Sequence, residues 1–137
     1  MISIQKISDS EMEVMKVIWD SEISLTSAQI LEVLNKDKSW KPTTVFTFLA
    51  RLEKKGVVKN KKIGRAKQYI ATLTEDEYKS FETKTFLDEV HKGSIKSFMA
   101  ALIDSNDIST EELEEIKKWF LNNFKWDDQI RLIQDNQ

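Results

Sequence analysis

The stretch from Trp40 to Thr72 constrains this chain most, because helix and strand signals follow one another there without a gap. Pro42 suits the first turn of a helix, and Gly56 suits the left-handed position just past its end. Two short runs with β-branched and aromatic residues, 57–63 and 67–72, then predict strands on either side of a three-residue turn. Two helical patterns precede this stretch. The order of the elements therefore predicts a winged helix-turn-helix.

The three helical patterns of the amino-terminal half each have a recognisable start. Residues 8–20 predict a first helix, capped by Ser8 or Asp9. The second begins at Thr26, where Thr26 and Gln29 have the form of a capping box. The third, 42–55, is expected to bury Val45, Phe48, Leu49 and Leu52, to expose Thr43, Thr44, Thr47, Arg51 and Lys54, and to carry Phe46 between these faces.

Positive charge is concentrated in the same stretch. From Lys36 to Lys67 the chain has eleven Lys and Arg against two acids, a net of +9 in a protein whose net charge is −2. This basic block consists of Lys36, Lys38, Lys41, Arg51, Lys54, Lys55, Lys59, Lys61, Lys62, Arg65 and Lys67. Residues 1–72 carry a net of +5 and residues 73–137 a net of −7. The asymmetry indicates a nucleic-acid-binding domain at 1–72 joined to a second region at 73–137, the alternative being that the hairpin lysines only keep a sheet edge soluble and unpaired.

The second region, 73–137, predicts three short amphipathic helices and a tail. Two further capping-box patterns, 74–77 and 109–112, mark helix starts. Three short helices without a sheet cannot bury their apolar stripes alone, so we expect this region to be a helical dimerisation region. The alternative is that the three helices fold back onto the first domain. The interface is expected to include Leu113, Ile116 and Phe120. The tail has too many apolar residues for a segment without contacts: Phe124, Trp126, Ile130 and Ile133. It is expected either to extend the last helix or to begin another.

The composition argues against an enzyme. Cysteine is absent, which excludes disulfides, thiolate metal sites and catalytic thiols. His91 is the only histidine, and the isolated glycines form no phosphate-binding loop. No cofactor or metal is therefore expected. The amino-terminal residues lack an apolar run suited to a signal peptide, and no later segment approaches a membrane span, so a cytoplasmic location is expected.

The predicted third helix and hairpin together suit DNA. Hydroxyl groups near the amino end of a recognition helix reach phosphates and bases, and Arg51 suits a phosphate or a guanine. Hairpin cations would flank the groove and add salt-sensitive affinity. The DNA-binding residues are expected to be Thr43, Thr44, Phe46, Thr47, Arg51, Lys54, Lys61, Lys62, Arg65 and Lys67. Two alternatives stay open: Arg51 pairing only with Glu32 or Glu53, and a winged helix that binds an acidic protein partner.

The residues 40–56, WKPTTVFTFLARLEKKG, closely resemble the recognition helix of the bacterial penicillinase-repressor family (BlaI/MecI type). Supporting matches are the run 13–19, Gly64-Arg65 with Tyr69, and Phe86-Leu87 followed by Gly93, so that the resemblance spans roughly residues 7–121. It implies a winged-helix homodimer that occupies a palindromic operator and represses transcription. It also implies that the repressor is inactivated by proteolysis in its dimerisation region after a membrane sensor detects a β-lactam. The resemblance thus implies a role in antibiotic resistance.

Three departures from the family pattern bear on the switch and on recognition. Copper-responsive relatives end in a cysteine cluster, so their metal switch is excluded here. Antibiotic-responsive relatives are cut at an Asn-Phe bond, and the matching bond here is Ala101–Leu102. Phe46 stands where relatives tend to carry a polar or basic residue. Repression by DNA binding is compatible with all three, whereas the inducing signal does not follow from the sequence.

Overall fold

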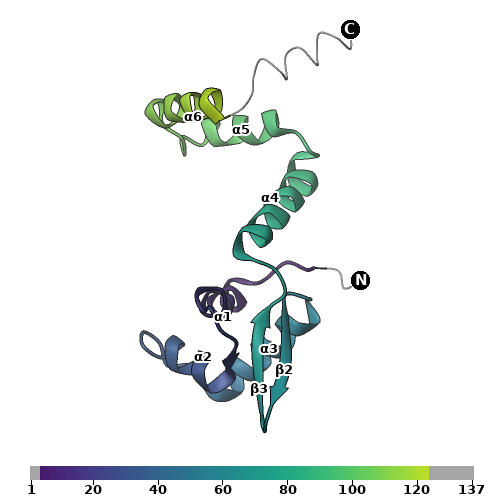
Figure 1. Ribbon diagram of the computed structural model, residues 1–137. Coiled ribbons are helices and arrows are strands. Elements are labelled where there is room, and N and C mark those ends of the chain that lie inside the picture. Colours follow the sequence, from purple (N-terminus) through teal and green to yellow (C-terminus); the bar gives the residue numbers. More distant parts are fainter. Residues whose placement is uncertain (1–3, 124–137) are drawn as a thin grey trace. The chain divides into compact units, whose positions relative to one another are not determined.

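The computed structural model describes residues 4–123, which fold into six helices and three short strands (Figure 1). In chain order these are α1 (Asp9–Asp20), β1 (Leu25–Thr26), α2 (Ser27–Leu34), α3 (Pro42–Lys54), β2 (Val58–Ile63), β3 (Ala66–Ala71), α4 (Glu75–His91), α5 (Ile95–Asp104) and α6 (Thr110–Asn123). The chain forms two compact units, one up to Lys84 and one from Thr85 onward, so that α4 contributes to both. The predicted tail beyond Asn123 lies outside the described residues.

The first unit is a winged helix, as predicted: three helices precede an antiparallel hairpin of β2 and β3. Ile63 pairs with Ala66, so the turn between the strands has two residues, one fewer than expected. Gly64 has a φ of 65° in this turn, a conformation that glycine adopts without strain. The short strand β1 joins the hairpin at β3 and gives the sheet order β1-β3-β2.

Local signals fix the ends of the first three helices. Ser8 caps α1 and Thr26 caps α2, each in a reciprocal capping box with the residue three positions on. Helix α3 starts at Pro42 without a side-chain cap. It stops before Gly56, whose φ of 81° has the left-handed value expected after a helix end.

Among residues 4–123, the hydrophobic core lies entirely in the first unit. Its buried hydrophobic residues are Ile7, Val14, Met15, Ile18, Ile30, Val45, Leu49, Leu52, Val57, Val58, Tyr69 and Tyr78. Helix α3 buries one side in this core, which leaves its opposite side to solvent. Tyr78 comes from the first turn of α4, and therefore α4 begins as part of the winged-helix unit.

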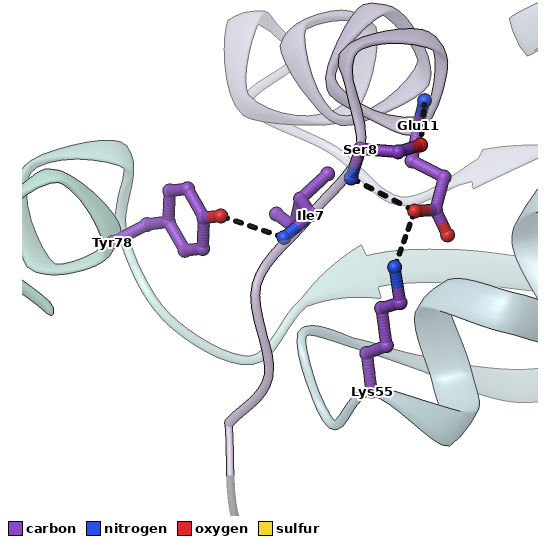
Figure 2. A network of polar contacts seen from close by, with 5 residues as sticks. All are labelled: Ile7, Ser8, Glu11, Lys55 and Tyr78. Carbon is purple, nitrogen blue, oxygen red and sulfur yellow. Dashed lines mark hydrogen bonds and ion pairs between the residues drawn. The ribbon is translucent and has the colours of Figure 1, made fainter. Parts of the chain in front are cut away.

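A polar network also ties this unit together (Figure 2). The Glu11 carboxylate accepts hydrogen bonds from the Ser8 backbone N–H, at 2.9 Å, and from the Lys55 ammonium. The Ile7 backbone N–H donates to the Tyr78 hydroxyl at 2.8 Å. Lys55, just after α3, and Tyr78, at the start of α4, are thereby both bonded to the residues at the start of α1 and just before it.

The second unit has a different character. None of its described residues, 85–123, is buried, and several large apolar side chains are exposed. These are Phe86, Val90, Ile95, Ile103, Ile116, Trp119 and Leu121. Phe86, His91 and Phe98 form a local cluster of rings, with ring centroids 5.6–6.3 Å apart. No described helix is long and apolar enough to cross a membrane.

Candidate nucleic-acid interface

The solvent-facing side of α3 carries the hydroxyl and cationic side chains predicted for it. Thr43, Thr47, Arg51 and Lys54 are exposed, and Thr44 is half-buried at the edge of this face. They are held outward because Val45, Leu49 and Leu52, at helical spacing, are completely buried on the other side. One rigid helix therefore presents these five side chains together.

Thr47 is more constrained than its exposure suggests. Its hydroxyl donates a hydrogen bond of 2.9 Å to the Thr43 carbonyl, one helical turn back. The single hydroxyl proton is thus used inside the helix, while the oxygen can still accept a bond and the methyl group remains available. In this rotamer Thr47 can accept from a base amino group or contact a thymine methyl. It cannot donate to a phosphate without rotating.

Arg51 is oriented by aromatic rings and not by an acid. Its guanidinium carbon lies 5.6 Å from the centre of the Phe48 ring, and Phe48 in turn packs edge-on against Trp40. Among the described residues Arg51 has no ion pair with Glu32 or Glu53. Glu53 instead accepts a hydrogen bond of 2.8 Å from the Asn60 amide. The guanidinium is therefore positioned and free to bind an external anion or base.

Two of the eleven cations of the basic block are engaged within the protein. Lys38 pairs with Glu13, and Lys55 pairs with the buried Glu11. The remaining nine form no ion pair within the part of the chain that the structure describes. The charge available to a partner is thus smaller than the composition implies, but it is concentrated on α3, on the loop before it and on the hairpin.

The hairpin brings like charges together. Lys62 and Lys67 are directly opposite each other in the antiparallel register, and Lys61 lies beside them opposite Gln68. Cross-strand pairs of equal charge destabilise a sheet, and here all three lysines are exposed. A polyanion lying along the hairpin would relieve this repulsion, and the predicted residues Lys61, Lys62, Arg65 and Lys67 are placed where such a partner can be bound.

A recess of about 400 Å³ separates α3 from the hairpin and the start of α2. It is lined by Thr26, Ser27, Ala28, Phe46, Arg65, Ala66, Lys67 and Tyr69. Phe46 forms one wall, and its side chain is 54% exposed although it is a large apolar residue. The recess is bordered by two cations and contains no acidic lining residue.

Sequence reasoning missed the polar support behind α3. Glu11 is 1% exposed, and its partner Lys55 lies 44 positions away in the sequence, so no local pattern indicated the pair. Burial raises the pKa of the Glu11 carboxyl, but the hydrogen bonds from Lys55 and Ser8 outweigh it, and the pKa lies below its ordinary value. Glu11 is thus held ionised, and it fixes the position of the residue that ends α3.

The residues predicted for cleavage and dimerisation lie in the second unit. Ala101 is exposed and Leu102 is half-buried, both within α5. On α6, Leu113 and Phe120 are half-buried and Ile116 is exposed. His91 is half-buried between two rings, with Nδ1 2.9 Å from the Ser97 hydroxyl. No group of three metal-ligating side chains exists among residues 4–123.

Comparison with known proteins places these features in context. The family model of the penicillinase repressor matches residues 7–121 of this chain. The penicillinase repressor of Bacillus licheniformis is 34% identical over 116 residues, covering 85% of this chain and 90% of that protein. The methicillin resistance regulatory protein MecI of Staphylococcus aureus (strain N315) is 33% identical over 112 residues, 82% of this chain and 90% of that protein.

Similarity to solved structures includes the first unit. The solution structure of the DNA-binding domain of the repressor BlaI superposes with a TM-score of 0.51 at 41% sequence identity. The match covers 57% of this chain and 94% of that domain.

Proposed function

The chain belongs to the penicillinase repressor family, and on this basis we propose that it is a DNA-binding transcriptional repressor. It occupies a palindromic operator as a homodimer and thereby blocks transcription. Each protomer inserts α3 into the major groove and lays its hairpin along the adjacent backbone. The chain acts in the cytoplasm, where its operator is, and we assign it no catalytic role.

One observation carries the proposal: a rigid helix presents hydroxyls and a free guanidinium, and unpaired cations surround it in a chain of net charge −2. Concentration of positive charge on one helix and the neighbouring hairpin of an otherwise acidic protein is the electrostatic footprint of a nucleic-acid-binding surface. The solved domain that resembles the first unit belongs to a protein described as a repressor, and that domain as DNA-binding.

The surface divides into two kinds of contact. Thr43, Thr44, Thr47 and Arg51 lie where a recognition helix meets base edges, so they contribute sequence preference. The cations at 54, 61, 62, 65 and 67 contact phosphates, fix the register of the protein on the duplex and make binding dependent on salt.

Dimerisation is assigned to the second unit. The described residues of this unit, 85–123, include no buried side chain, so hydrophobic burial among them contributes little to its stability. A second copy would cover its exposed apolar residues, and Leu113, Ile116 and Phe120 on α6 belong to that contact. Twofold symmetry of the protein then implies a palindromic operator, because each protomer reads one half-site.

Release from the operator follows proteolysis by a signalling protease, as in a β-lactam-type response. The predicted bond, Ala101–Leu102, lies inside α5, where the Ala101 carbonyl accepts a hydrogen bond of 3.1 Å from the Ser105 N–H. A protease must first open this helix locally. Because Ala101 is exposed and α5 is short, local unfolding of this helix requires little free energy.

A gel-shift titration with the DNA upstream of the protein's own gene and its neighbours tests the proposal. Specific binding should appear against excess random duplex, and its affinity should fall steeply as salt rises. A winged helix that binds an acidic protein would instead show weak duplex binding even at low salt. That outcome would overturn the assignment as a repressor.

A further inference from the structure

Phe46 is an apolar group set into a polar, charged surface. It is the fifth residue of α3, between the buried Val45 and the exposed Thr47, and 54% of its surface is exposed. The core does not need it, since the inner side of α3 is already filled by completely buried residues. A phenylalanine so exposed beside Arg65 and Lys67 indicates a contact that forms only when a ligand is bound.

The chemistry of the ring limits what it can recognise. It has no hydrogen-bond donor or acceptor, so it cannot read the polar edge of any base pair. In the major groove the one apolar group is the C5 methyl of thymine, which cytosine has only when it is methylated at the same carbon. The two cations at the border of the recess also limit where the Phe46 ring can lie. Arg65 and Lys67 attract backbone phosphates, which brings the ring toward the floor of the major groove.

We propose that Phe46 is a specificity-determining residue that reads the 5-methyl group of one thymine in each half-site of the operator. This inference rests on the proposed function, because it assumes that α3 lies in the major groove. The ring loses its exposed surface against the methyl group while the flanking cations hold the backbone. Operator preference at that position is then set by an apolar contact and not by hydrogen bonds.

The test removes the methyl group from the DNA and leaves the protein unchanged. Once footprinting has located the operator, each thymine is replaced in turn by deoxyuridine, which keeps every hydrogen-bonding group and lacks only the methyl. Burial of one methyl group corresponds to about fourfold in affinity, and replacement in both half-sites to about sixteenfold. The wild-type protein should show this loss at one symmetry-related pair of thymines.

Two protein variants complete the experiment. Phe46→Gln, a change at an exposed helical position, should bind the thymine and deoxyuridine operators equally well. Val33→Gln is the matched control, because Val33 is also apolar, helical and 44% exposed, on α2 and outside the recess. It should retain the wild-type preference. Circular dichroism verifies that both variants fold.

A second arm does not depend on any variant. Cytosine at the sensitive position should weaken wild-type binding, and 5-methylcytosine should restore part of the loss. The inference is overturned if the wild-type protein binds its operator tightly but no thymine is sensitive to loss of the methyl, or if Phe46→Gln remains equally sensitive. Failure of the wild-type protein to bind any upstream DNA overturns the proposed function itself.

Discussion

Replacing Lys55 by Met should destabilise the protein mainly because it leaves the buried carboxylate of Glu11 without its cation. Glu11 has a side chain that is 2% exposed, and among residues 4–123 the one charged group bonded to it is Lys55, itself 24% exposed. Its second oxygen, Oε2, is buried without a hydrogen-bond partner in the described structure. Methionine keeps the apolar stem of the lysine but leaves the carboxylate with the Ser8 N–H alone.

The expected magnitude follows from this geometry. Breaking a fully buried ion pair from one side costs about 3–5 kcal/mol, and losing a hydrogen bond to a charged group about 1.5–3 kcal/mol. Water reaches Lys55, so we expect about 2–3 kcal/mol at pH 7. Glu11→Gln should cost less, about 1 kcal/mol, because the amide oxygen still accepts from Ser8 and the lysine can turn to solvent.

The dependence on pH separates this mechanism from a packing defect. In the wild-type protein the pKa of Glu11 is lowered on folding, so its stabilising contribution is present above the unfolded pKa and is lost as pH falls through the folded one. Without Lys55, the lowering effect of its hydrogen bond and charge is lost while burial still raises the pKa, so the pKa of Glu11 rises relative to wild type. The cost of Lys55→Met should therefore shrink as the pH is lowered from 7 toward 4, because a protonated Glu11 needs no cation.

Urea unfolding of the full chain, followed by circular dichroism at one fixed protomer concentration, measures these differences at pH 7, 5.5 and 4.5. Lys54→Met is the matched control, since it removes the same charge from the neighbouring exposed position and should change stability by less than about 0.5 kcal/mol. A cost for Lys55→Met that is equal at every pH, or no larger than that of Lys54→Met, would refute the reasoning.

Three further predictions concern DNA, assembly and the switch. Arg51→Ala and Thr47→Ala should weaken specific operator binding by about 1–3 kcal/mol, whereas Gln at both Lys61 and Lys62 should weaken binding to all duplexes and lower the log–log salt slope by about 1.8. Equal effects of both sets on operator and random DNA would contradict the division into base and phosphate contacts. Leu113→Asp or Ile116→Asp should yield monomers in sedimentation, because a charge is left unpaired in an apolar contact; an intact dimer would remove that residue from the interface. Mass spectrometry of the protein from induced cells should detect a fragment ending between Ile95 and Asp104, and full-length protein throughout derepression would rule out proteolysis.

Much of the winged helix could be predicted because its signals are local. Helix caps, the proline start of α3 and the glycines at its end and in the hairpin turn act within a few residues of where they stand. Each of these features was read from the sequence and is present in the structure.

Pairings between distant residues could not be predicted in this way. Lys54 and Lys55 are adjacent and chemically identical, yet one is exposed on the outer face of α3 and the other turns inward to Glu11. Tyr78 accepts a hydrogen bond from a residue 71 positions away, although its own helix begins with acids that suggest a solvent-exposed segment. No local pattern distinguishes such cases, because the partner is set by how the helices pack.

The separation of core and exposed apolar surface explains how stability and operator release can be uncoupled. All buried hydrophobic residues of the described chain lie between Ile7 and Tyr78, so a cut in α5 removes nothing on which the winged helix depends. The same cut detaches α6 and with it Leu113, Ile116 and Phe120, the apolar residues assigned to the dimer. Linked half-sites raise apparent affinity by about 10²–10⁴ without any new DNA contact, and this gain disappears when the link is broken. A protein built in this way can lose its operator while its DNA-binding unit remains folded, and no ligand has to enter the core.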